Sequence, residues 1–106
     1  MDYTNLVAAA HYAISQAIEG KGRDRHADNK SFDRQPLFTI TELLGDGSGL
    51  AFQAIKKIQE AQRMSPEKAI QEYRGAVVYT LALLLYTNSK LSTGLVPGLD
   101  GLKEEK

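Results

Sequence analysis

Residues 76–86 read AVVYTLALLLY, the longest apolar run in the chain. A membrane-spanning helix needs roughly 20 apolar residues, and this shorter run contains two tyrosines and a threonine. We therefore interpret it as part of a buried helix and expect no membrane anchor. Ser65-Pro66-Glu67 precedes the run and has the form of a helix start, with a serine cap, a proline at the first helical position and an acid in the first turn. The pattern predicts a long helix over residues 66–88.

This predicted helix becomes apolar on all sides beyond Ala76. One stripe consists of Ala69, Ile70, Tyr73, Ala76 and Val77, and the opposite side carries Val78, Ala82 and Leu85. A helix that is apolar all round must be covered all round, and a few short helices cannot easily do this within one small chain. We therefore predict a homo-oligomer, with Phe52, Val78, Ala82 and Leu85 at its interface. The alternative is that a loop or the tail covers this side.

Three further helices are predicted before residue 66. A helix over residues 5–19 starts at a cap formed by Thr4 or Asp2 and ends at Gly20. A short helix over residues 39–44 opens with a capping box, Thr39-Ile40-Thr41-Glu42, and ends at Gly45. The fold class is therefore all-α, a small helical bundle of three long helices and one short helix.

The third of these helices covers residues 48–64, with Ser48 as its cap. Its apolar stripe is predicted to consist of Leu50, Ala51, Ala54, Ile55, Ile58 and Ala61. Phe52 points away from this stripe, which is why it is assigned to the oligomer interface.

The 106 residues leave room for one domain, which we place at residues 1–90. Residues 20–36 have no helical periodicity and are predicted to form a long loop that is functional or mobile. Beyond Asn88 the composition turns to glycine, proline and charge, so residues 91–106 are predicted to be a flexible or draped tail.

Thirteen basic and thirteen acidic residues cancel, which disfavours binding to bulk nucleic acid. The chain has no cysteine, and the stretch from Met1 to Glu19 lacks the basic start of a signal peptide. We therefore expect a cytoplasmic protein.

The segment from Lys21 to Arg34 contains five of the thirteen basic residues and also His26. Guanidinium groups are suited to phosphoryl oxygens, and an aromatic ring can stack on a base. We predict that an anionic, nucleotide-like ligand binds here, through Lys21, Arg23, Arg25, His26, Phe32 and Arg34. Gly47 and Ser48 are added because a glycine-rich turn leading into a helix start favours anions. The competing interpretations are a solvated, salt-bridged loop and a plain helix-to-helix turn.

No metal, cofactor or catalytic residue is predicted. His11, Asp24, His26 and Asp28 lack the spacing of helical metal sites, and no nucleophile is paired with a base. Helical nucleotide pyrophosphohydrolases hold magnesium with an E-x-x-E pattern that this chain lacks. An enzyme is therefore not expected, and a magnesium-dependent nucleotide hydrolase using Glu72 is the residual possibility.

The string KGRDRHADNKSFDRQP at residues 21–36, followed by two amphipathic helices, resembles small uncharacterised helical proteins of tailed bacteriophages and prophages. The resemblance covers roughly residues 21–88 and implies an accessory role in the host cytoplasm. By analogy of architecture, it suggests an anti-defence protein that sequesters a nucleotide signal. We therefore predict a non-enzymatic binding protein for such a ligand. The alternative is a protein-interaction module that acts on a host protein through apolar helix faces or the C-terminal tail.

Overall fold

A computed structural model describes residues 2–19, 36–91 and 93–95. Its helices are α1 (Thr4–Glu19), α3 (Pro36–Leu44), α4 (Ser48–Ala61) and α5 (Pro66–Ser89). These described residues contain no strand, so the predicted all-α class is confirmed.

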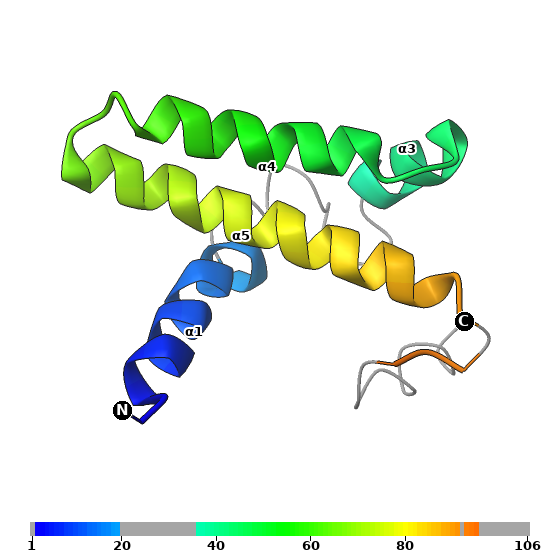
Figure 1. Cartoon of the computed structure of the whole chain (residues 1–106), viewed down its shortest axis with the longest axis horizontal. Coiled ribbons are helices and arrows are strands. Elements are labelled where there is room, and N and C mark those ends of the chain that lie inside the picture. Colours follow the sequence, from blue (N-terminus) through cyan, green and yellow to red (C-terminus); the bar gives the residue numbers. More distant parts are fainter. Residues whose placement is uncertain (1, 20–35, 92, 96–106) are drawn as a thin grey trace.

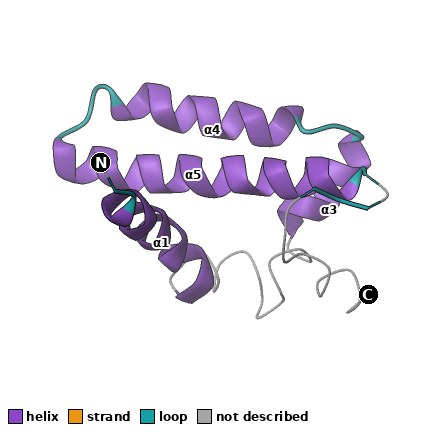
Figure 2. Ribbon diagram, turned by 60° about the horizontal axis from the view of Figure 1, so that its bottom comes forward, coloured by secondary structure: helices purple, strands orange, loops and turns teal. Residues whose placement is uncertain are grey.

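The helices α4 and α5 form an antiparallel pair that makes up most of the fold (Figure 1). The short helix α3 lies at the end of this pair where α4 begins and α5 ends (Figure 1). Helix α1 packs against α5 on a different side from α4, and its N-terminal half extends away from the pair (Figures 1 and 2). Helix α5 is therefore the central element.

The connection between α4 and α5 is a tight turn over residues 62–65. The N–H groups of Gln62, Arg63 and Met64 each donate to the carbonyl three residues earlier, at 3.3, 3.1 and 3.1 Å. Helix α4 consequently ends at Ala61 and does not reach residue 64. Ser65 occupies the cap position of α5 with extended backbone and is followed by Pro66, as predicted, although its side chain makes no capping hydrogen bond.

The predicted capping box at Thr39 is wrong, because α3 already includes Pro36 and Thr39 lies inside the helix. Proline suits the first turn of a helix, where its missing N–H is not needed. Thr41 is buried and its hydroxyl donates to the carbonyl of Leu37 at 2.7 Å. The end of α3 is at Gly45, as predicted: its φ is 81°, and its N–H donates to the carbonyl of Thr41 at 3.0 Å.

The core is built mainly from alanine. Six of the eight buried apolar residues in the described chain are alanines, and the other two are Leu50 and Tyr86. Leu50 and Tyr86 form a cluster with Ala82, against which Leu37, Tyr79, Leu83 and Leu85 pack. Alanine lets helices approach closely but removes little apolar surface from water, so this arrangement leaves most large apolar side chains near the surface.

The buried face of α4 differs from the predicted stripe. Leu50, Ala54 and Ala61 are buried, as expected, but Ile55 and Ile58 are 65 and 46% exposed. The place of Ile55 against α5 is taken by Lys57, whose side chain lies across Gly75, where an added Cβ would be 2.8 Å from the lysine Cδ. The Lys57 ammonium reaches Glu72 at 3.8 Å. A lysine stem packs on apolar surface while its charge remains near water, a role that a pattern of apolar residues does not show.

Candidate interaction surface

Most of the predicted ligand-binding residues lie outside the described part of the chain. These residues are Lys21, Arg23, Arg25, His26, Phe32 and Arg34, and the predicted loop over residues 20–36 lies outside it almost entirely. The nucleotide site therefore stays a prediction from sequence.

The two described members of that site, Gly47 and Ser48, form the start of α4. Gly47 is the cap residue, where Ser48 had been predicted, and α4 begins at Ser48. The Asp46 carboxylate accepts hydrogen bonds from the N–H and the hydroxyl of Ser48, at 2.9 and 2.6 Å. These two hydrogen bonds hold the pKa of Asp46 below its ordinary value, and the one from the hydroxyl has the larger effect. A carboxylate of the chain itself thus caps this helix start, at the position assigned to a ligand anion.

The predicted oligomer interface is only partly at the surface. Phe52 is 60% exposed, whereas Ala82 is 0% exposed and lies in the core, so its assignment to an interface is corrected. Val78 and Leu85 are half-buried, and Leu85 packs against the core cluster. By helical periodicity, Val78 and Leu85 share a side of α5 with Arg74, which contacts α1. The chain's own first helix therefore packs on the side of α5 that was predicted to need a second copy.

Arg74 fastens α1 to α5. Its guanidinium lies 4.0 Å from the centre of the Tyr12 ring, and its Nε donates to the Tyr12 carbonyl at 3.1 Å. Its Nη2 donates to the Ser15 hydroxyl at 3.1 Å, and its Nη1 donates to Gln71 at 2.8 Å. A guanidinium that stacks and donates in several directions fixes the orientation of α1.

A different side of α5 is not covered by any of the other helices in the described residues, and we call it the α5 face. It consists of Ile70, Tyr73, Val77, Leu81 and Leu84, which are 49, 40, 37, 38 and 44% exposed. Their spacing of three or four residues places them in one row, as on any amphipathic helix. The row contains no charged residue. A solvent-facing row of this kind is characteristic of a surface that another molecule covers.

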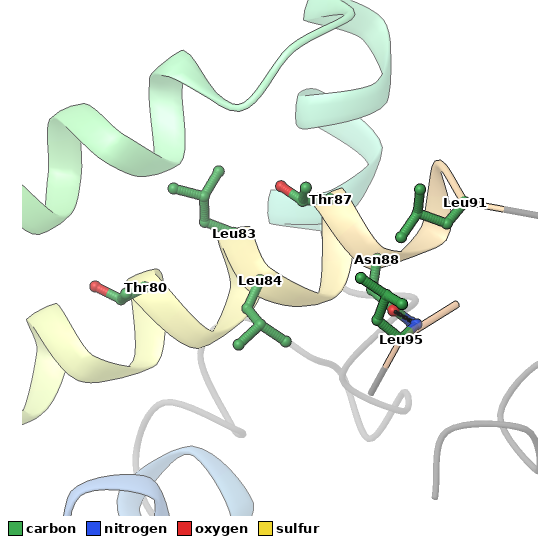
Figure 3. A pocket seen from close by; sticks show the side chains of 7 residues that line it. All are labelled: Thr80, Leu83, Leu84, Thr87, Asn88, Leu91 and Leu95. Atoms are coloured by element: carbon green, nitrogen blue, oxygen red, sulfur yellow. Dashed lines mark hydrogen bonds between the residues drawn. The ribbon is translucent and has the colours of Figure 1, made fainter. Parts of the chain in front are cut away.

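The α5 face continues into an open apolar groove of about 390 Å³ near the end of the helix (Figure 3). The residues that line this groove are Thr80, Leu83, Leu84, Thr87, Asn88, Leu91 and Leu95. The chain turns back beyond α5, and the N–H of Leu95 donates to the Asn88 side-chain oxygen at 2.6 Å. This bond places Leu95 beside Leu84 and Leu91, so the row of apolar side chains extends past the end of the helix.

Helix α1 carries a second uncovered apolar surface, which we call the α1 face. Tyr3, Leu6 and Val7 are 73, 66 and 65% exposed. The same side of the helix continues into Ala13, which is buried. Between Tyr3 and Ile18 the chain contains no Asp, Glu, Lys or Arg. Helices that face water on one side normally carry charged residues there, so this composition is typical of a helix with neighbours on more than one side.

Sequence reasoning found the excess of apolar surface on α5 but assigned it to the wrong side. Ile70, Tyr73 and Val77 were placed in one apolar stripe with Ala69 and Ala76, by their helical spacing. In the structure Ala69 and Ala76 of this stripe are buried, as predicted, whereas the three large members are more than a third exposed. Gly75 lies against Lys57 of α4. The row of small residues was the available signal, because close helix packing requires them.

The described residues contain no group of three or more His, Cys, Asp or Glu side chains that could hold a metal ion. None of the helices in the described ranges is long and apolar enough to cross a membrane. Comparisons of the chain with protein-family models, with curated proteins and with solved structures find no match.

Proposed function

We propose that this chain is a protein-interaction module that binds an apolar helix of a protein partner through the α5 face. The proposal is supported by one observation above all: five large apolar side chains stand in one uncharged row on the central helix, and each is more than a third exposed. A partner helix that packs along such a row presents its own apolar side chains to it at the same spacing of three and four residues.

The energetics favour a partner that makes more than one contact. Full burial of a large apolar side chain contributes about 1.5 to 3 kcal/mol, so covering the exposed part of five such residues contributes roughly 3 to 6 kcal/mol. Association itself costs at least about 4 kcal/mol in lost translation and rotation. The α5 face alone therefore supports a weak complex, and a stable complex needs a second apolar contact.

Site-specific photo-crosslinking in living cells that express the chain tests this proposal. A photoreactive amino acid at Val77 is expected to give a covalent adduct with a polypeptide, visible as a shifted band on a denaturing gel. The matched control is the same amino acid at Lys68, an exposed residue of α5 outside the row. No adduct at Val77, or equal adducts at both positions, would overturn the proposal.

A second proposal is the binding of an anionic, nucleotide-like ligand by the segment from Lys21 to Arg34. The observation that favours it is compositional: five basic residues stand within fourteen positions of a chain with zero net charge. Isothermal titration against linear and cyclic nucleotides is expected to give a salt-sensitive signal that disappears in an Arg23→Ala, Arg25→Ala double variant. Silence across the panel would remove this second proposal.

A further inference from the structure

We propose that the partner helix is α1 of a second copy of this chain, so that the α1 face of each copy packs on the α5 face of the other in a two-fold dimer. The inference rests on the proposed function, since it names the occupant of the α5 face. Three features of the described residues support this pairing: the apolar chemistry of both faces, their placement in the chain, and the small residue Ala10 beside Leu6 and Val7.

The two faces match in chemistry. The α1 face extends about 6 Å along the chain from Tyr3 to Val7, so it covers one part of the row from Ile70 to Leu84, which spans about 21 Å. Neither face carries an Asp, Glu, Lys or Arg side chain. A charged or strongly polar partner would leave its own groups without partners against the α5 face, whereas a second copy of α1 would not.

The chain itself prevents α1 from covering its own α5 face. The contacts of Arg74 with Tyr12 and Ser15 hold α1 on a neighbouring side of α5. The N-terminal half of α1, with Leu6 and Val7 on it, extends away from the α4 and α5 pair (Figure 1). A second copy related by a two-fold axis brings each projecting α1 onto the other copy's α5. The same contact then forms twice in the dimer, and it covers the α1 face and the α5 face of each copy.

The first half of α1 is also narrow enough for close packing. Ala10 lies three and four residues after Val7 and Leu6, on the same side of the helix, and is exposed. Small side chains let two helices approach so that large side chains of the partner, such as Tyr73 and Leu84, fit beside the backbone. Within one chain, alanines of α4 and α5 already pack in this way.

Analytical ultracentrifugation of the full chain tests the dimer and its pairing. The wild type is expected to sediment with the mass of two chains. Leu6→Glu and Val77→Lys are each expected to weaken the dimer at least about 100-fold, because each places an unpaired charge against an apolar face. Both positions are exposed in the single chain, and an unchanged helical circular dichroism spectrum checks that each variant folds. Gln59→Glu, at an exposed position of α4, is the control and is expected to remain dimeric.

Mixing the two variants distinguishes this pairing from other dimers. In a mixed dimer, one contact is native and the other sets the introduced glutamate of one variant against the introduced lysine of the other. An equimolar mixture is therefore expected to recover the mass of two chains. A dimer in which two α5 faces meet would not recover, because the introduced lysine would still face an apolar row. A mixture that remains monomeric overturns the pairing.

The inference and the proposed function can fail separately. A wild type with the mass of one chain at about 100 µM overturns the inference, since an exclusive self-contact of this size would be populated there. A photo-adduct at Val77 with a different polypeptide would in that case leave the proposed function standing. No adduct of any kind would remove both.

Discussion

Gly47 stands where α4 begins, and a side chain at this position would require a neighbouring side chain to shift. A Cβ at this position would collide with the end of the Leu83 side chain, which packs on the core cluster. Gly47→Ala is therefore expected to lower the free energy of unfolding by about 1 kcal/mol or less, because only a terminal methyl group of Leu83 must shift and alanine is a poorer cap residue than glycine. Urea unfolding followed by circular dichroism measures the change.

Gly49 provides the matched control for this substitution. A Cβ there would lie 3.6 Å from Leu44, which is ordinary contact. Because glycine is unfavourable inside a helix, Gly49→Ala is expected to raise the free energy of unfolding by roughly 0.5 to 1 kcal/mol. Equal effects of the two substitutions would contradict the packing described for Gly47.

Asp46 is expected to make the stability of α4 depend on pH. Its folded pKa is below the ordinary value of 3.8, because the charged carboxylate accepts two hydrogen bonds from Ser48. A lowered pKa means that the stabilisation is present above the unfolded pKa and is lost as the pH falls through the folded pKa. The melting temperature of the wild type is therefore expected to fall more steeply below about pH 4 than that of Asp46→Asn. If the melting temperatures of the two proteins depend on pH in the same way, Asp46 does not cause the loss of stability at low pH.

At the scale of elements, Arg74 makes most of the polar contacts that hold α1 on α5. Arg74→Ala removes the stacking on Tyr12 and the hydrogen bonds to the Tyr12 carbonyl and the Ser15 hydroxyl. These interactions are partly exposed, so their loss is expected to weaken the docking of α1 by about 1 to 2 kcal/mol. Hydrogen exchange on dilute protein should show roughly tenfold faster exchange of α1 amides, with α4 and α5 little changed. Arg63→Ala, at an exposed site in the turn after α4, should leave α1 unaffected.

The elements also show where local sequence signals hold. The Ser65-Pro66 start of α5 and the left-handed glycine at Gly45 depend on backbone geometry that neighbouring residues impose, and both lie where the sequence predicted them. The capping box at Thr39 failed, because the helix extends back to Pro36 and the same residues are compatible with a helix interior. A proline and a glycine with positive φ restrict the backbone themselves, whereas a threonine and a glutamate occur inside helices as well as at their starts.

At the scale of the whole molecule, alanine makes up most of the core, and most of the large apolar side chains lie near the surface. If the apolar faces of α1 and α5 cover each other between copies, folding and association are linked, and stability depends on protein concentration. The melting temperature is expected to rise by about 3 to 6 °C for each tenfold increase in concentration. Differential scanning calorimetry over two decades of concentration measures this rise. The Val77→Lys variant should show none, and a wild type without such a rise would contradict the linkage.

The sequence by itself determined the helical class, the approximate places of four helices, and the presence of more apolar surface on α5 than a few short helices can cover. These features follow from periodicity and from glycine and proline, which act over a few residues. Only the tertiary structure decided which side of α5 is covered. A helix that is apolar on every side offers several stripes of similar hydrophobicity, and the choice among them depends on how closely the neighbouring helices approach. Alanine and Gly75 allow α4 to approach one side, Arg74 holds α1 on a second, and the row from Ile70 to Leu84 is left outside.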